Sequence, residues 1–105
     1  MFKQINIQQF CELQNTKTVN IADIRDLASF QAGRIPNAQH LDNDSLAGFI
    51  SSTAQEEALV VCCYHGNSSQ GAAQYLAEQG YKEVYSLQGG FELWKVSQPN
   101  AIEQG

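Results

Sequence analysis

One apolar segment, residues 59–63, restricts the possible folds more than any other feature of the sequence. Its residues, Leu-Val-Val-Cys-Cys, include no charged or strongly polar position, so the alternation typical of a half-exposed strand is missing. A short strand that is apolar throughout is buried on both faces, as in a parallel sheet covered by helices. A helical pattern at residues 69–79 follows after a short loop. The two segments together predict part of a β-α-β crossover.

The rest of the chain alternates in the same way between short β-rich segments and helical patterns. Further strands are predicted at residues 4–7, 18–24, 38–41 and 84–87, and further helices at residues 8–14, 27–31, 46–50 and 91–96. This order predicts an α/β fold in one domain that spans residues 1–105. We expect a central, mostly parallel five-stranded sheet flanked by helices on both faces. Ligands should bind beyond the carboxyl ends of its strands.

Residues at the ends of the predicted helices indicate where each helix begins or stops. Asn43 or Asp44 is expected to cap the helix that follows it. Ser68 or Ser69 is expected to cap the helix after the buried strand, because serine is a favoured capping residue. Gly33 stands where the helix at residues 27–31 should end.

The balance of charge and the cysteine count exclude several classes of function. The chain has 11 acidic and 6 basic residues, which gives a net charge of −5. Because phosphate groups are bound mainly through Lys and Arg, we expect no nucleic-acid partner and no anionic membrane partner. The longest apolar run is far shorter than the ~20 residues that span a bilayer, and the N-terminus does not resemble a signal peptide. Three cysteines, an odd number, favour a reducing compartment, so we expect a cytoplasmic protein.

The loop after the buried strand combines a cysteine with the expected geometry of an anion site. A tight wrap of residues 64–68 would turn backbone N–H groups toward the sulfur of Cys63, and the following helix adds partial positive charge there. Both effects favour a thiolate, so Cys63 is a candidate nucleophile. Gly66 and Asn67 tolerate the backbone angles that such a wrap needs. An ordinary buried cysteine in a βα turn is the alternative interpretation at this point.

Several segments of the chain match one known family in the same order. They are residues 23–26 with Phe30, residues 33–38, residues 63–69, residues 71–76 with 80–81, and residues 89–91 with Trp94. With these segments the chain resembles the single-domain rhodaneses, and especially the bacterial GlpE-type thiosulfate sulfurtransferases. The resemblance covers nearly the whole chain and implies a rhodanese-like α/β domain.

The resemblance implies that Cys63 is catalytic and carries a persulfide. The Cys63 thiolate would take the outer sulfur of thiosulfate, release sulfite, and then pass the sulfur to cyanide or to a thiol or dithiol acceptor. A thioredoxin-like dithiol protein is among the acceptors that the resemblance implies, and no cofactor or metal is expected. Because many relatives carry a basic residue in this loop and this chain offers only His65, whose charge near neutral pH depends on its surroundings, we expect weak binding of thiosulfate. The residues expected to bind substrate are Tyr64, His65, Gly66, Asn67, Ser68 and Ser69.

Three alternative functions fit parts of the same sequence. A phosphatase with the rhodanese fold would need a loop one residue longer that ends in an arginine, but Ser69 occupies that position and no arginine follows before Gly80. A non-catalytic binding module of this fold commonly lacks the cysteine. A persulfide carrier in a protein relay would use the same cysteine chemistry, so the sequence leaves that function open.

The other reactive residues are interpreted as structural. Cys62 should point to the opposite face of the strand from Cys63 and pack in the core. Cys11 is expected to be half-buried in the first helix, and His40 to be a structural or surface residue. A metal site built from these cysteines and histidines is not expected, because their spacing is not typical of zinc ligands.

A group of charged residues follows the second predicted strand. Asp23, Arg25 and Asp26 are expected to form an ion pair and a turn that hold the fold together rather than take part in catalysis. Arg34 has the right charge to assist an incoming anion, but nothing in the sequence places it near Cys63.

Overall fold

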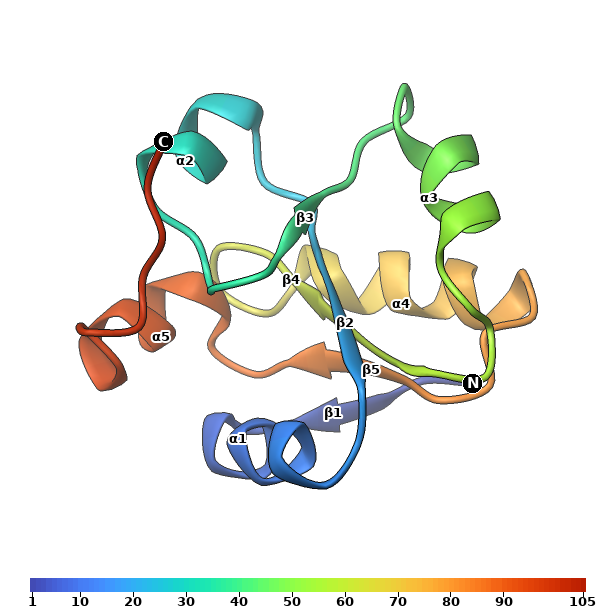
Figure 1. Ribbon diagram of the computed structural model, residues 1–105, viewed down its shortest axis with the longest axis horizontal. Coiled ribbons are helices and arrows are strands. Elements are labelled where there is room, and N and C mark those ends of the chain that lie inside the picture. The colour runs from blue at the N-terminus through green and yellow to red at the C-terminus, as the bar shows by residue number, and fades with distance from the viewer.

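The computed structural model describes residues 1–105 as one sheet with helices on both of its faces (Figure 1). The strands are β1 (Lys3–Ile5), β2 (Val19–Asp23), β3 (Gln39–His40), β4 (Ala58–Cys62) and β5 (Val84–Leu87). The helices are α1 (Ile7–Thr16), α2 (Leu27–Ala32), α3 (Leu46–Ser52), α4 (Ser68–Glu78) and α5 (Gly90–Ser97). The sheet has the order β1-β5-β4-β2-β3, and all neighbouring strands are parallel. This arrangement confirms the predicted five-stranded α/β fold.

Strand β4 is the centre of the sheet and delivers the candidate nucleophile to its edge. All of its residues are buried, which confirms the expectation from the apolar segment. Strands β2 and β5 flank β4, so both of its edges are hydrogen-bonded. Cys63 follows the last residue of β4 directly. It therefore lies at the carboxyl edge of the sheet, where ligands of open α/β folds bind.

Two apolar clusters, one on each face of the sheet, hold the helices in place. One cluster joins α1 and α5 to the sheet and includes Phe10, Val60, Cys62, Phe91 and Trp94. The other joins α3 and α4 to the sheet and includes Phe49, Leu59, Val61, Ala73 and Leu76. Figure 1 shows α1 and α5 on one side of the strands and α3 and α4 on the other. Successive residues of β4 thus pack against different helices, as the alternation of side chains along a strand requires.

The first strand is shorter than predicted, because the chain turns into α1 at Asn6. Asn6 Oδ1 accepts a hydrogen bond from the Gln9 N–H at 2.8 Å, and Gln9 Oε1 accepts one from the Asn6 N–H at 3.0 Å. This reciprocal pair is a capping box, which satisfies two backbone donors at the start of the helix. Ile7, which the alternating pattern placed in the strand, is therefore the first residue of α1.

The predicted cap of α3 is wrong. Neither Asn43 nor Asp44 occupies the capping position, which belongs to Ser45. The Asp42 N–H donates to Ser45 Oγ at 3.0 Å, and the Ser45 N–H donates to Asp42 Oδ1 at 2.9 Å. These two bonds close a turn before the helix, so Ser45 takes the capping position and α3 begins at Leu46.

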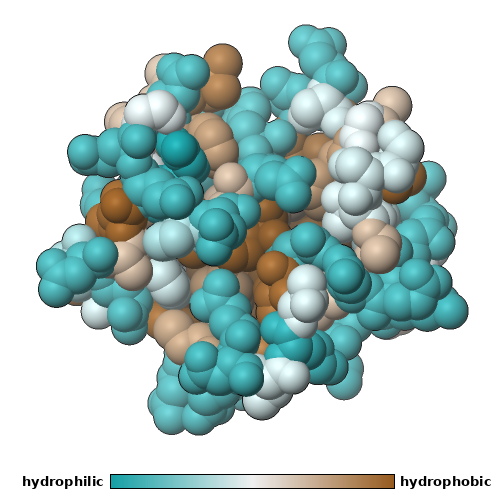
Figure 2. Space-filling view, in the orientation of Figure 1, coloured by the Kyte–Doolittle hydropathy of each residue, from teal (hydrophilic) through white to brown (hydrophobic).

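The surface of the molecule is mainly hydrophilic, with a smaller hydrophobic area near the middle of the face shown in Figure 2. That area lies over the part of the sheet where Figure 1 shows β2 and β3. None of the helices combines the length and the apolar character that crossing a bilayer requires.

Candidate active site

The sulfur of Cys63 is surrounded by hydrogen-bond donors from the loop and from the first turn of α4. The Gly66 N–H donates to Sγ at 3.1 Å and the Ser69 N–H donates to it at 3.3 Å. Ser69 Oγ also lies 3.3 Å from Sγ. The residue is 4% exposed, whereas the neighbouring Cys62 is 0% exposed. Cys63 therefore keeps a small exposed fraction, while Cys62 is closed off in the core.

The pKa values of the two neighbouring cysteines are shifted in opposite directions. Burial raises the pKa of Cys63, but hydrogen bonds from the Ser69 side chain and from the backbone of Ser69, Gly66 and His65 outweigh it, so its pKa lies below the ordinary value of a thiol. Burial and the nearby Asp23 carboxylate raise the pKa of Cys62 well above the ordinary value, because Arg25 and the one backbone hydrogen bond from Phe91 offset them only slightly. Backbone and hydroxyl dipoles, rather than a basic side chain, thus favour a thiolate at Cys63.

Neither serine caps α4 in the way that the sequence suggested. Asn67 occupies the capping position, and its side chain makes no capping hydrogen bond. The backbone N–H of Ser69, which a capping side chain would normally satisfy, is directed at Cys63 Sγ instead. The sulfur therefore takes the place of the cap, and Ser69 lies inside the helix with its side chain buried.

The predicted substrate-binding residues divide into two groups. Gly66 and Ser69 are buried and contact the sulfur. The other four are exposed on the surface of the loop and at the start of α4, and they are Tyr64, His65, Asn67 and Ser68. The first group can stabilise charge on Cys63 Sγ, and the second can contact a molecule that approaches it.

Helix α5 holds the outer side of the loop. The Phe91 N–H donates to the Cys63 carbonyl oxygen at 2.8 Å, and the Glu92 N–H donates to the Tyr64 carbonyl oxygen at 3.0 Å. The C=O and N–H groups of one peptide plane point in opposite directions. Because the Tyr64 carbonyl faces α5, the N–H of His65 is turned away from α5 and contributes to the donors around the sulfur.

This docking depends on Gly90, where the loop and α5 meet backbone to backbone. Gly90 has a φ of +58°, and a Cβ atom there would collide with the Cys63 carbonyl oxygen and lie 2.5 Å from the Tyr64 oxygen. We expect Gly90→Ala to push the loop away from α5, which should lower the free energy of unfolding by about 1–3 kcal/mol and lower the rate of the sulfur transfer that the resemblance implies. Urea unfolding and a thiocyanate assay would measure the two effects.

Gly48 in α3 provides the matched control, because a Cβ atom there would meet nothing within 4 Å. Alanine favours helix more than glycine does, so Gly48→Ala should leave activity unchanged and stability equal or slightly higher. Equal stability and activity in the Gly90→Ala and wild-type proteins would contradict the role given to this contact.

The tip of the loop is tied to α2 through the Tyr64 hydroxyl. That hydroxyl lies 2.8 Å from Ser29 Oγ and donates to the Asp26 carboxylate. Asp26 also caps α2, since its Oδ2 accepts from the Ser29 N–H at 3.0 Å. Hydrogen bonds from Tyr64 and Ser29 lower the pKa of Asp26 to about 2. Asp26 thus forms the expected turn, and it also anchors the loop.

Arg25, the cationic residue beside the loop, is paired with a buried carboxylate. Arg25 and Asp23 are buried, and Arg25 Nη2 lies 2.8 Å from Asp23 Oδ2, which confirms the predicted ion pair. The same nitrogen donates to the Gly33 carbonyl oxygen at 2.7 Å, and the guanidinium group lies 4.2 Å from the centre of the Phe91 ring. Arg25 therefore supports the fold between β2 and α5.

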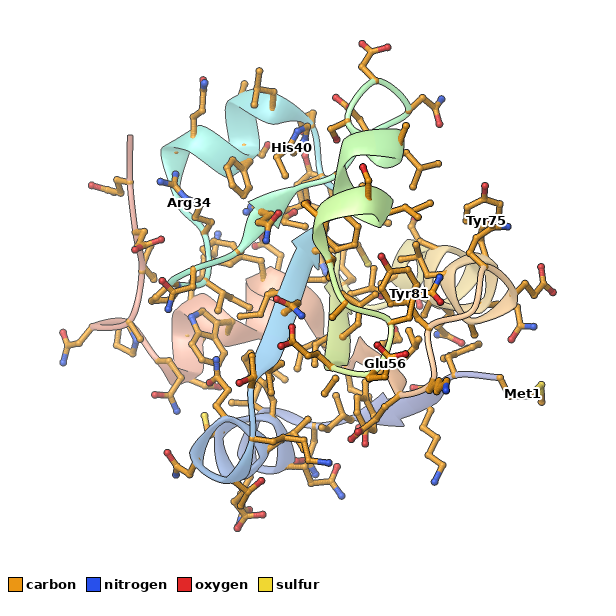
Figure 3. All side chains as sticks on the ribbon, turned by 45° about the vertical axis from the view of Figure 1, so that its right-hand side comes forward. Met1, Arg34, His40, Glu56, Tyr75 and Tyr81 are labelled. Carbon is orange, nitrogen blue, oxygen red and sulfur yellow. The ribbon has the colours of Figure 1, made fainter.

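Three other residues considered from the sequence are engaged elsewhere. Arg34 lies beside the C-terminal segment, where its Nε is 3.8 Å from a carboxylate oxygen of Glu103 (Figure 3). His40 Nε2 lies 2.6 Å from the Arg25 carbonyl oxygen, as expected of a structural histidine. Cys11 is half-buried in α1, as predicted.

A comparison with protein families places this arrangement in a known context. The model of the rhodanese-like domain matches residues 6–97. The chain belongs to the rhodanese-like family. The family match extends from the start of α1 to the end of α5 and so includes the whole of the Cys63 loop.

Rhodanese-like relatives from several bacteria are similar to nearly the whole chain. A protein of Ectopseudomonas mendocina named thiosulfate sulfurtransferase GlpE is 53% identical over 99% of this chain and 94% of its own length. Proteins with the same name from Pseudomonas putida and Pseudoalteromonas translucida are 48% and 46% identical, over 99% and 98% of this chain and 94% and 98% of their own lengths.

Solved structures show the same fold at much lower identity. The rhodanese-like domain of a protein from Anabaena has a TM-score of 0.85 and 21% identity, and the match covers 100% of this chain and 81% of that chain. A rhodanese-related protein from Thermoplasma volcanium has a TM-score of 0.76 and 23% identity, over 92% of this chain and 94% of that chain. The rhodanese fold is therefore shared although most residues differ.

Proposed function

We propose that residues 1–105 form one rhodanese domain that acts as a thiosulfate sulfurtransferase, with Cys63 as the residue that carries the sulfur. Proteins named thiosulfate sulfurtransferase that are 46–53% identical over nearly the whole chain support the reaction class. The convergence of the Gly66 and Ser69 N–H groups on Cys63 Sγ is the observation that carries the residue assignment.

In the first step the Cys63 thiolate attacks the outer sulfur of thiosulfate. A Cys63 S–S bond forms, the S–S bond of thiosulfate breaks, and its electron pair leaves with sulfite. The products are a Cys63 persulfide anion and sulfite dianion, so the total charge is unchanged. Donors aimed at the sulfur before the reaction stabilise the negative charge without having to reorganise.

In the second step a nucleophilic acceptor removes the outer sulfur. Cyanide attacks it, the Cys63 S–S bond breaks, thiocyanate leaves, and the thiolate is restored. A thiol or dithiol acceptor follows the same course, and we include a thioredoxin-like dithiol protein among the acceptors. Because the two half-reactions share one covalent intermediate, ping-pong kinetics are expected.

Substrate binding is assigned to the loop and the first turn of α4. Gly66 and Ser69 would hold the sulfur that reacts, and the exposed groups would contact the rest of the anion; they are Tyr64, His65, Asn67 and Ser68. Arg25 is committed to Asp23, so no free arginine compensates for the missing basic residue in the loop. Weak binding of thiosulfate therefore stays our prediction. All three cysteines are free, as a reducing cytoplasm favours, and we place the protein there.

Intact mass measurement tests the proposal. After treatment with thiosulfate and removal of the excess, the protein should gain the mass of one sulfur atom and release one equivalent of sulfite. Cyanide should remove the added sulfur as thiocyanate. The Cys11→Ser and Cys62→Ala variants should still gain the sulfur, because neither thiol has the donors that surround Cys63.

Two results would overturn the proposal. One is a wild-type protein that gains no sulfur at millimolar thiosulfate but turns over a chromogenic phosphomonoester, which would favour the phosphatase alternative. The other is a mass gain that disappears in the Cys11→Ser or Cys62→Ala variant but persists when Cys63 is blocked. Sulfur accepted only from a protein persulfide would favour the relay carrier.

A further inference from the structure

Hydrogen bonds link the sulfur of Cys63 to a residue outside its loop. We propose that Ser86 of β5 is a positioning residue for sulfur transfer, whose hydroxyl orients the Ser69 hydroxyl toward Cys63 Sγ. The inference rests on the proposed function, because it gives Ser86 a part in stabilising the anionic sulfur that the reaction uses.

The three side chains form a continuous line of polar atoms. Ser86 Oγ lies 2.7 Å from Ser69 Oγ, which in turn lies 3.3 Å from Cys63 Sγ. Ser69 is 0% exposed and Ser86 is 1% exposed, so both hydroxyls are shielded from bulk water. Ser69 is the only hydrogen-bonding partner that the chain offers to the Ser86 hydroxyl. Ser86 can therefore influence the sulfur only through Ser69.

The register of the sheet places Ser86 below the start of α4. Ser86 pairs with Val61 of β4, two residues before Cys63. Val61 belongs to the apolar cluster that α3 and α4 cover, and so does Val84, on the same face of β5. A hydroxyl buried among such residues is unfavourable unless it is hydrogen-bonded. Alanine or valine would suit this position better if the bond to Ser69 had no role.

The direction of the two hydroxyls follows the charge on the sulfur. A thiolate only accepts, so the Ser69 proton turns toward Sγ and leaves Ser69 Oγ to accept from Ser86. Both O–H dipoles then point toward the negative charge, and each strengthens the other. A neutral thiol can instead donate to Ser69 Oγ, and the two O–H dipoles then have no negative charge to stabilise. Because a hydrogen bond to the charged form favours that form, Ser86 supports the thiolate and the persulfide anion.

The charged and titratable groups around the sulfur leave this line intact. By element they are Cys62 on β4, Asp23 and Arg25 at the end of β2, Asp26 before α2, Tyr64 and His65 in the loop, and Glu92 with Lys95 on α5. Cys62 stays protonated, and the four side chains of β2 and α5 form two ion pairs. None of them contacts the Ser86 hydroxyl, so a change at Ser86 tests the line itself.

The test is a titration of thiolate absorbance near 240 nm, taken as the difference between each protein and its Cys63→Ser counterpart. Ser86→Ala should lower the acid dissociation constant of Cys63 about three- to tenfold, so that the midpoint moves to higher pH. The rate of sulfur loading should fall by a similar factor below the midpoint and recover at alkaline pH. A purely structural effect would lower the rate at every pH.

Two comparisons show whether Ser86 acts through Ser69. In a Ser69→Ala background, Ser86→Ala should produce no further shift, because the intermediary is gone. Thr53→Val, which removes a hydroxyl from another buried residue, should leave the midpoint unchanged. If Ser86→Ala is too unstable to titrate, Ser86→Thr and Ser86→Val serve as a pair of equal size, and only Thr should keep the wild-type midpoint.

An unchanged midpoint in Ser86→Ala, or the same shift with and without Ser69, would overturn the inference. The titration uses no sulfur donor, so its result is independent of whether thiosulfate is the substrate. A wild-type protein that fails to load sulfur would instead contradict the proposed function, whatever Ser86 does to the titration.

Discussion

Replacing Cys63 with serine is expected to lower thiosulfate:cyanide sulfurtransferase turnover by about a thousandfold or more. A serine hydroxyl is protonated at neutral pH and cannot form a persulfide, so both half-reactions lose their covalent carrier. The Gly66 and Ser69 N–H groups can still donate to an oxygen in place of the sulfur, so the fold should persist. Thiocyanate formation would measure turnover, and thermal unfolding would show that the protein is intact.

Cys62→Ala is the control for this experiment, because Cys62 is adjacent in sequence but packs in the cluster under α1 and α5. The substitution should cost some stability through lost packing and leave most of the turnover. Turnover that survives in Cys63→Ser and disappears in Cys62→Ala would move the nucleophile to the other face of β4 and contradict the proposed site.

The second large effect is expected at the buried ion pair. Arg25→Met would leave the Asp23 carboxylate buried without its partner, which should lower the free energy of unfolding by about 3–5 kcal/mol. The variant would also lose the hydrogen bond to the Gly33 carbonyl oxygen and the contact with the Phe91 ring. Urea unfolding followed by circular dichroism would measure the change.

Arg34→Met is the matched control, because Arg34 pairs with a half-exposed Glu103 at the longer distance of 3.8 Å. An ion pair near the surface contributes little, so this variant should lose less than about 1 kcal/mol. Similar losses of the free energy of unfolding in the two variants would mean that burial does not make the Arg25 ion pair more important than the Arg34 pair. Replacing both Asp23 and Arg25 with apolar residues should recover part of the stability, because no buried charge is left alone.

The fold was predictable because it depends on local patterns. The apolar residues 59–63 indicated a central strand, and the alternation of strands and helices indicated a parallel sheet. The wrong predictions concern helix starts, where several neighbouring polar residues could each occupy the single capping position. The Asn6 capping box was visible in the sequence as an asparagine followed three residues later by a glutamine, but the apolar alternation through Ile7 hid it.

The site was predictable only in part. Cys63 and Gly66 stand out in the sequence, because a cysteine and a glycine between a buried strand and a helix have few roles. The orientation of the loop depends on hydrogen bonds from Phe91 and Glu92, which are far along the chain and join the loop only in the folded protein. Ser86 gives no signal in the sequence, since its partner Ser69 is reached only through the register of β4 and β5.

The donors that point at Cys63 Sγ are mainly peptide groups rather than ionisable side chains, and this has a consequence for the range of conditions in which they act. An amide does not lose its dipole when the solution becomes alkaline, whereas a lysine or histidine in the same place would become neutral. The attraction is also short-ranged and shielded inside the loop, so added electrolyte should weaken it little. The peptide dipoles around Cys63 should therefore persist at every pH at which the protein remains folded.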